Sequence, residues 1–262
     1  MERMECSALF LDVRNFTKQL SDDKKKIDFI NIIQEVYLCG LKTCESIVKK
    51  EQFYINSTGD GFLIVVFSEK HYLEAFLLAL LLHIRVTDLF KKHKWQNLEE
   101  GAYYFGIGLE SGYVYKVVAQ NNEGKKIETY LGDVINIASR LEALSKEHAR
   151  APIIYGLELN QFLVSKLCNK NYKELMEKAK NNACNSEEYH REMNEINSKL
   201  LSSYLFENRL KGVEKPMPVF RISPTLFLSE QKAVDNFIEL LPQEYETLIT
   251  DIIPAQKFEK NE

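Results

Sequence analysis

The sequence lacks most features that mark secreted, membrane or nucleic-acid-binding proteins. Its five cysteines are an odd number without a CxxC pair, which argues against a disulfide framework or a zinc site. Its most apolar segment, residues 75–82, is too short to span a bilayer, and the start, MERMEC, lacks the apolar core of a signal peptide. The net charge is −4 without a basic block, which argues against nucleic acid as a partner. We therefore expect a cytoplasmic protein with reduced thiols and no membrane contact.

The residues that are present predict one large α+β domain. Hydrophobic residues make up 45% of the chain and charged residues 27%, enough for a substantial core. The elements follow the order β-α-β-β-α-β, which is typical of a ferredoxin-like fold with a mostly antiparallel sheet and helices on one face. The predicted strands are residues 8–11, 52–57, 62–67, 103–109, 113–119, 127–131, 153–155, 203–210 and 219–222. The predicted helices begin at residues 21–23, cover residues 71–94, follow residue 133, and cover residues 157–167.

Some segments invite more specific predictions. In the first long helix, an apolar stripe at helical spacing predicts the buried face: Ile30, Ile33, Tyr37, Leu41, Cys44 and Val48. Residues 166–202 are polar and rich in Lys, Glu and Asn, so we expect a helical insertion on the surface of a domain that covers residues 1–223. Residues 224–262 form a C-terminal extension, whose amphipathic patch at 233–241 packs back on the domain or contacts a second subunit.

Two acidic residues occupy positions that suit a metal site. Asp12 ends the strand at residues 8–11, and Asn15 offers an N-cap to the next turn. Asp60 lies in Thr58-Gly59-Asp60-Gly61, the turn of the hairpin formed by residues 52–57 and 62–67. Either residue alone is more often structural. If the hairpin pairs beside the first strand, however, the two carboxylates meet and require a cation between them, as Mg²⁺ with substrate phosphates provides.

A third stretch, residues 130–142, begins at a Gly-Asp turn and continues as a helix. Asn136 and Arg140 are four residues apart and share one face, where an amide and a guanidinium suit a sugar and a phosphate. Val134, Ile137 and Leu141 form the expected buried face. For this helix taken alone, a solvated surface Arg is the simpler interpretation.

Together these stretches resemble the catalytic domain of the class III nucleotide cyclases. The matching segments occur in the family's order and are LFLDVRNFT (9–17), STGDGFLIVVF (57–67), GIGLESGYV (106–114), YLGDVINIASRLE (130–142) and LKGV (210–213). The resemblance implies that Asp12 and Asp60, with the carbonyl of Val13, hold two divalent metal ions, Mg²⁺ or Mn²⁺. It also implies that the amides near Phe16 and Thr17 bind the β- and γ-phosphates of a nucleoside triphosphate.

The resemblance further implies a homodimer with shared active sites. The metal-binding Asp pair comes from one subunit and the Asn and Arg from the other, so that C₂ symmetry gives two equivalent sites. In such a site, Arg140 stabilises the transferring phosphoryl group, Asn136 orients the ribose, and Lys211 reaches the terminal phosphates.

The positions that read the base differ from the purine pattern. Asn56 stands where purine cyclases of this family have Lys or Glu, and Thr129 stands where most have Asp or Cys. The chain looks like the stand-alone pyrimidine cyclases of bacterial Pycsar anti-phage systems, whose cyclic product is read by a separate effector protein. We expect a cyclase of UTP or, failing that, CTP. The alternatives are an adenylate cyclase, because Thr occurs with Lys in some of these, and an inactive cyclase-like dimer that binds nucleotide.

Overall fold

The computed structural model describes residues 2–21, 26–95, 103–120, 124, 126–147, 151–180, 187–210, 213, 215–223 and 231–252. Its strands form one sheet in the order β2-β3-β1-β4-β6-β8-β7, and β5 pairs with β4 outside this path. All neighbouring strands are antiparallel except β4 and β6. The strands are β1 Glu2–Val13, β2 Phe53–Ser57, β3 Gly61–Val66, β4 Phe105–Gln120, β5 Lys126–Leu131, β6 Ile153–Tyr155, β7 Ser202–Asn208 and β8 Met217–Ile222.

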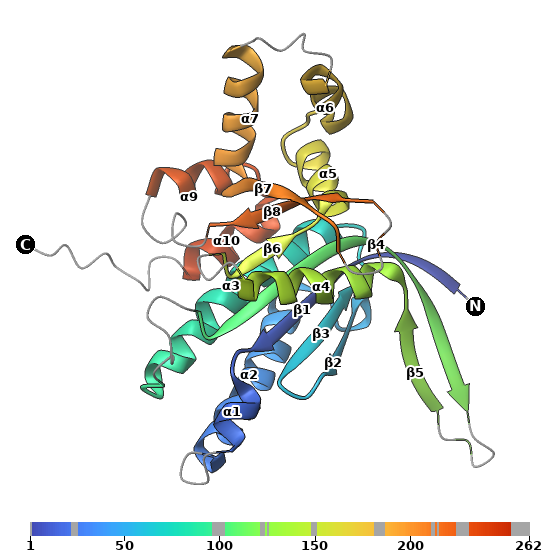
Figure 1. Ribbon diagram of the computed structural model, residues 1–262, viewed down its shortest axis with the longest axis vertical. Helices are drawn as coiled ribbons and strands as arrows, with labels where there is room; N and C mark the ends of the chain where they lie inside the picture. The colour runs from blue at the N-terminus through green and yellow to red at the C-terminus, as the bar shows by residue number, and fades with distance from the viewer. Residues whose placement is uncertain are drawn as a thin grey trace, which may run out of the picture.

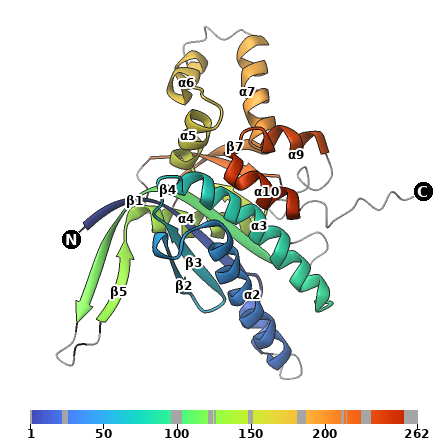
Figure 2. The same cartoon turned by 180° about the vertical axis from the view of Figure 1, so that it is seen from behind.

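Helices cover both faces of this sheet, so the prediction of helices on one face is wrong. Figure 1 shows α4 across one face, and Figure 2 shows α2 and α3 across the other. The reason is that β1 and β3 are apolar on both faces: Leu9 and Leu11 pack in the core under α2 and α3, whereas Ala8 and Val65 pack in a second core. The helices are α1 Phe16–Leu20, α2 Lys26–Ile47, the 3₁₀ turn Lys50–Gln52, α3 His71–Lys92, α4 Asp133–Glu147 and α5 Leu157–Lys166, followed by α6, α7, α9 and α10.

Two strands are longer than the sequence suggested. β1 begins at Glu2, because residues 2–7 pair with β4. β4 runs unbroken through Ser111 and Gly112, where we expected two strands to meet. The side chain of Ser111 lies inside the sheet within 2.7 Å of the Ser7 hydroxyl, so this Ser-Gly pair stabilises the strand and does not turn it.

The buried face of α2 also differs from the predicted stripe. Ile30 and Leu41 are exposed, whereas Phe29, Ile32 and Val36 are fully buried. The apolar residues of α2 extend around more than one stripe, and contact with α3 and the sheet decides which of them face inward. Of residues 21–23, where this helix was expected to begin, Ser21 caps the end of α1, and residues 22 and 23 lie outside the described residues.

The helices that follow α5 lie at two places. α6, Tyr172–Lys180, and α7, Glu187–Lys199, project from the top of the molecule in Figure 1. α9, Gln231–Ile238, and α10, Gln243–Ile252, pack against the core beside α3. In α10, which the sequence did not predict, the Tyr245 hydroxyl donates to the buried Glu74 carboxylate at 2.7 Å. Helices α9 and α10 therefore pack back on their own chain.

The described residues contain neither a disulfide nor a membrane helix. All four described cysteines are free, and Cys184 lies outside the described part. In the same ranges, no helix combines the length and the apolar character needed to cross a bilayer.

Glycine residues on β4 allow α4 to lie directly on the sheet. A Cβ atom at Gly108 would lie 2.2 Å from both the carbonyl oxygen of Ala138 and the amide nitrogen of Glu142. At Gly106 it would lie 2.0 Å from the Ser145 hydroxyl. Since real Cβ contacts are much longer, these two positions require glycine for close approach. This approach fixes where every side chain of α4 lies relative to β1.

Gly108→Ala should lower the free energy of unfolding by about 1–3 kcal/mol, the usual cost of overpacking a core. The added methyl group would meet the backbone of α4, which cannot move away as a flexible side chain can. Gly112→Ala, on the same strand, is the matched control, because its Cβ would meet only the Val134 side chain at 3.3 Å. Urea unfolding compares the two variants, and equal losses of stability would contradict the proposed close approach.

Candidate active site

Asp12 and Asp60 lie together at one end of the sheet. Asp12 pairs with Gly61 of β3 on one side and with Gly106 of β4 on the other. The amide of Val13 donates to the carbonyl of Asp60 at 3.1 Å, which ties the hairpin turn to the end of β1. The prediction that the hairpin pairs beside the first strand is confirmed. Burial and then the neighbouring carboxyl of Asp12 raise the pKa of Asp60, as expected for two acids in close contact.

The hairpin turn that carries Asp60 is held by contacts with α2. Gly59 has a φ of +103°, a conformation that L side chains rarely adopt. The Tyr37 hydroxyl donates to the carbonyl of Gly59, and the Ser57 hydroxyl donates to Tyr37 at 3.0 Å. Contacts with α2 therefore fix the backbone just before Asp60.

The C-terminal half of α4 carries two charged residues near Asp12 that the sequence analysis missed. Lys146 donates to Oδ2 of Asp12 at 2.6 Å, and its Nζ lies 3.6 Å from Oε2 of Glu142. Burial and then the charge of Asp12 raise the pKa of Glu142 to about 7, although Lys146 and Arg14 oppose this shift. The signal in the sequence was a Glu-Lys pair at i and i+4 on the helix that carries Arg140.

The segment after Asp12 leads directly into α1. Arg14 donates from Nη2 to the carbonyl of Ser145 at 2.6 Å, which joins this segment to α4. Asn15 takes the N-cap position as predicted, but its backbone is left-handed, with φ 60°, and its side chain makes no capping hydrogen bond. The first hydrogen bond of α1 runs from Gln19 to Asn15, so the amides of Phe16 and Thr17 are not used within the helix.

Asn136 and Arg140 lie on a different edge of α4 from Lys146. Arg140 and Lys146 are separated by about 9 Å along the helix axis and by about 120° around it. Asn136 is exposed and Arg140 is half-buried. In the described part of the chain, neither side chain makes a hydrogen bond or an ion pair. The structure therefore does not bring them to the Asp12–Asp60 pair of the same chain.

The two base-reading positions lie on different strands, β2 and β5, which contact each other through aromatic rings. Asn56 is exposed on β2, and Thr129 is half-buried on β5, where it faces Val117 of β4. β5 and the second half of β4 form a two-stranded arm that extends away from the rest of the sheet (Figure 1). No hydrogen bond joins Asn56 to Thr129 among the described residues. Lys211, which we expected near the terminal phosphates, lies outside the described residues.

The arm presents an apolar face to solvent. Because opposed residues of antiparallel strands share a face, the pairs Tyr115–Leu131 and Ala119–Ile127 lie on the same side. Tyr113 shares this side, and it is exposed together with Tyr115, Ile127 and Leu131. A pocket of about 650 Å³ opens between this face and the start of α4. Such a contiguous apolar surface is typical of a protein–protein contact.

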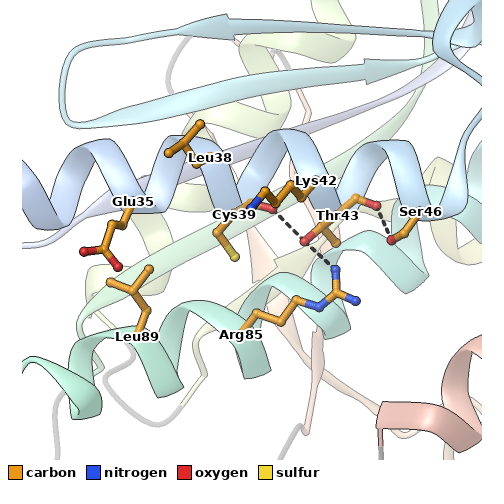
Figure 3. A pocket seen from close by; sticks show the side chains of 8 residues that line it. All are labelled: Glu35, Leu38, Cys39, Lys42, Thr43, Ser46, Arg85 and Leu89. Atoms are coloured by element: carbon orange, nitrogen blue, oxygen red, sulfur yellow. Dashed lines mark hydrogen bonds between the residues drawn. The ribbon is translucent and has the colours of Figure 1, made fainter.

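A second pocket lies on the other side of the sheet, between α2 and α3 (Figure 3). It measures about 530 Å³, and Arg85 within it donates to the Thr43 hydroxyl at 2.9 Å. Since α2 and α3 lie across the sheet from α4, this pocket plays no part in the site at Asp12.

The donor set at Asp12 and Asp60 fits Mg²⁺ or Mn²⁺ bound together with a phosphate-bearing ligand. Among the described residues, no three His, Cys, Asp or Glu side chains are grouped as a protein-only metal site requires. Mg²⁺ commonly takes only one or two carboxylates from the protein and completes its shell with phosphate oxygens and water. The contact between Lys146 and Asp12 shows that a cation is accepted at this carboxylate.

Comparison of the fold identifies solved nucleotide cyclases. The adenylyl cyclase CyaB from P. aeruginosa has a TM-score of 0.59 and 15% identity, over 84% of this chain and 94% of that chain. A bacterial light-regulated adenylyl cyclase has a TM-score of 0.57 and 14% identity, over 92% and 100% of the two chains. The guanylate cyclase domain of RhGC from Catenaria anguillulae, solved in complex with GTP, has a TM-score of 0.54 and 17% identity, over 84% and 97%. At these identities the likeness concerns the fold.

Comparison of the sequence identifies the family. No curated protein sequence matches the chain. The family model of the Adenylate and Guanylate cyclase catalytic domain matches residues 1–151, more than half of the chain, and this match includes Asp12, Asp60, Asn136 and Arg140. The chain therefore belongs to the adenylate and guanylate cyclase catalytic domain family, the class III nucleotide cyclases.

Proposed function

We propose that the protein is a homodimeric cyclase that converts a pyrimidine nucleoside triphosphate, UTP before CTP, to the 3′,5′-cyclic monophosphate and pyrophosphate. The observation that carries this proposal is the division of α4 into two edges. One edge lies against the Asp12–Asp60 pair, and the other presents Asn136 and Arg140 without partners in the described part of the same chain. A site assembled from two chains would use both edges.

In the proposed reaction, the ribose 3′-oxygen attacks the α-phosphorus in line, loses its proton, and displaces pyrophosphate. Asp12, Asp60 and the carbonyl of Val13 would hold two divalent ions, Mg²⁺ or Mn²⁺. When bound, such ions lower the pKa of the 3′-hydroxyl and neutralise the triphosphate. The amides of Phe16 and Thr17, which are not used within α1, would bind the β- and γ-phosphates.

The partner subunit would supply the remaining groups. Arg140 would neutralise the charge that develops on the transferring phosphoryl group, and Asn136 would orient the ribose. Lys211 would reach the terminal phosphates. The exposed apolar face of the arm, which includes Tyr115 and Leu131, supports a second copy of this chain as the partner.

The base preference rests on the chemistry of Asn56 and Thr129. A Lys at the first position offers only hydrogen-bond donors, and an ionised Glu offers only acceptors. Asn56 offers one of each, as does the Thr129 hydroxyl, which suits the N3–H and O4 edge of uracil or, with the amide reversed, the edge of cytosine. UTP is placed before CTP because uridylate cyclases are the commoner kind among the proteins that the chain resembles.

The biological role that we propose is synthesis of a second messenger in bacterial antiviral defence. The catalytic domain would cover residues 1–223, with an insertion at about 166–202, and residues 224–262 would form an extension. The free thiols of the described cysteines suit a cytoplasmic protein, and a separate effector would read the cyclic product. The main competing function is an adenylate cyclase that makes cyclic AMP.

Asp12→Asn and Asp60→Asn should each reduce cyclase activity at least about 100-fold, because each removes a carboxylate from the proposed two-ion site. The measurement is the cyclic nucleotide formed with Mn²⁺, identified by mass spectrometry. Asp88→Asn on the exposed side of α3 is the control and should keep full activity. Full activity in either site variant, with the fold intact by circular dichroism, would rule out the two-ion assignment.

Subunit mixing tests the shared site. Asp12→Asn and Arg140→Ala proteins should each be inactive, but after exchange of subunits about a quarter of wild-type activity should return. Half of the dimers would then be mixed, and each mixed dimer would contain one intact site out of two. Absence of activity despite exchange demonstrated by native mass spectrometry would show that the site is built within one chain.

Incubation with each of the four ribonucleoside triphosphates tests the base preference. UTP, or failing that CTP, should be cyclised much faster than ATP or GTP, because unpaired polar groups penalise the wrong base. Asn56→Lys should depress pyrimidine turnover, since the acceptor of the amide is lost. Efficient turnover of ATP with little of either pyrimidine would replace the pyrimidine assignment by the adenylate one.

A further inference from the structure

Lys146 makes the shortest ion pair at the proposed metal site. Its Nζ lies 2.6 Å from Oδ2 of Asp12 and 3.6 Å from Oε2 of Glu142, which is four residues earlier on α4. The lysine side chain is 45% exposed, whereas those of Asp12 and Glu142 are only 18% and 7% exposed. One partly solvated cation therefore contacts two largely buried carboxyl groups.

The second carboxylate has unused capacity to accept a hydrogen bond. Oε1 of Glu142 is buried and has no hydrogen-bond partner among the described residues. A buried oxygen without a partner is costly, and a charged donor such as an ammonium group would satisfy it. Because α4 is held by its contacts with Gly106 and Gly108, Lys146 can change partner by rotating its side chain alone.

We propose that Lys146 is a built-in counter-ion of the metal site, which competes with the divalent ion for Asp12 and moves fully onto Glu142 when that ion binds. The inference rests on the proposed function, since it assumes that Asp12 is a metal ligand. It assigns Lys146 and Glu142 as residues that set the affinity for the ion. Lys146 neutralises Asp12 beside Asp60 whenever the ion is absent.

The test is isothermal titration calorimetry, in which Mn²⁺ is titrated into the full-length protein without nucleotide. Lys146→Met keeps the apolar stem and removes the competing charge, so the Kd for Mn²⁺ should fall roughly tenfold, which corresponds to about 1.4 kcal/mol. Lys146→Gln also removes the charge and should lower the Kd in the same way, so it replaces the Met variant if that variant folds poorly. Lys199→Met is the matched control, because Lys199 forms an i,i+4 pair with Glu195 on α7, and it should leave the Kd unchanged.

The role of Glu142 is tested in the wild-type protein and in the Lys146→Met variant. Glu142→Gln should weaken Mn²⁺ binding several-fold, because Lys146 then lacks a second carboxylate and stays on Asp12. In the Lys146→Met background the same substitution should have a smaller effect, since there is no ammonium group to receive. Equal effects in both backgrounds would show that Glu142 acts only through its own charge and would overturn its assignment as the acceptor.

The outcomes separate this inference from the function on which it rests. An unchanged or raised Kd in Lys146→Met, with wild-type protein binding Mn²⁺, overturns the inference alone. A raised KM for the nucleotide at an unchanged Kd for Mn²⁺ would assign Lys146 to the triphosphate and also overturn it. If Asp12→Asn and Asp60→Asn bind Mn²⁺ as the wild type does, the proposed metal site itself is wrong.

Discussion

The position of α4 on the sheet depends on backbone-to-backbone contact with β4. The backbone of α4 lies against Gly108, and the side chains of Ser145 and Glu142 lie against Gly106, so α4 is close enough for its last turn to reach Asp12. The same approach directs its other edge outward, with Asn136 exposed and Arg140 half-buried. Since a helix of this length is rigid, one contact places both halves of the proposed chemistry.

Electrostatics around Asp12 leaves the site ready for a cation. The carboxyl groups of Asp12, Asp60 and Glu142 all act electrostatically on Lys146, although among the described residues they are not grouped as a metal site made by protein alone requires, and Arg14 supplies a second positive charge. Burial and the neighbouring acid raise the pKa of Glu142 to about 7, so part of the repulsion is relieved by protonation. Among the described residues at this strand end, the three carboxyl groups outnumber the two cationic side chains. A divalent ion would neutralise the remaining negative charge.

The sequence predicted what depends on local pattern. The hairpin around Gly59 and Asp60 follows from turn residues between β-rich runs, and α3 follows from a long apolar run with a helical period. The continuity of β4 was missed because a Ser-Gly pair such as Ser111-Gly112 is typical of a turn. In the structure, cross-strand contact of Ser111 with Ser7 keeps this pair extended. Lys146 was missed for a related reason: its partner Asp12 is 134 residues away, and only the packing of α4 on β4 joins them.

The described surfaces also support the proposal that the active site is shared between two chains. A half-buried guanidinium without a carboxylate partner loses hydration and gains no hydrogen bonds in return, and Arg140 is in this position within the described residues. The arm exposes Tyr113, Tyr115 and Leu131, whose apolar surface would be removed from water if another surface covered it. In the proposed dimer, two-fold symmetry would pair the Asp12–Asp60 end of each chain with the outward edge of α4 of the other chain. Apolar contact and charge complementarity would then favour the same assembly, and neither requires any residue beyond those that the chain already presents.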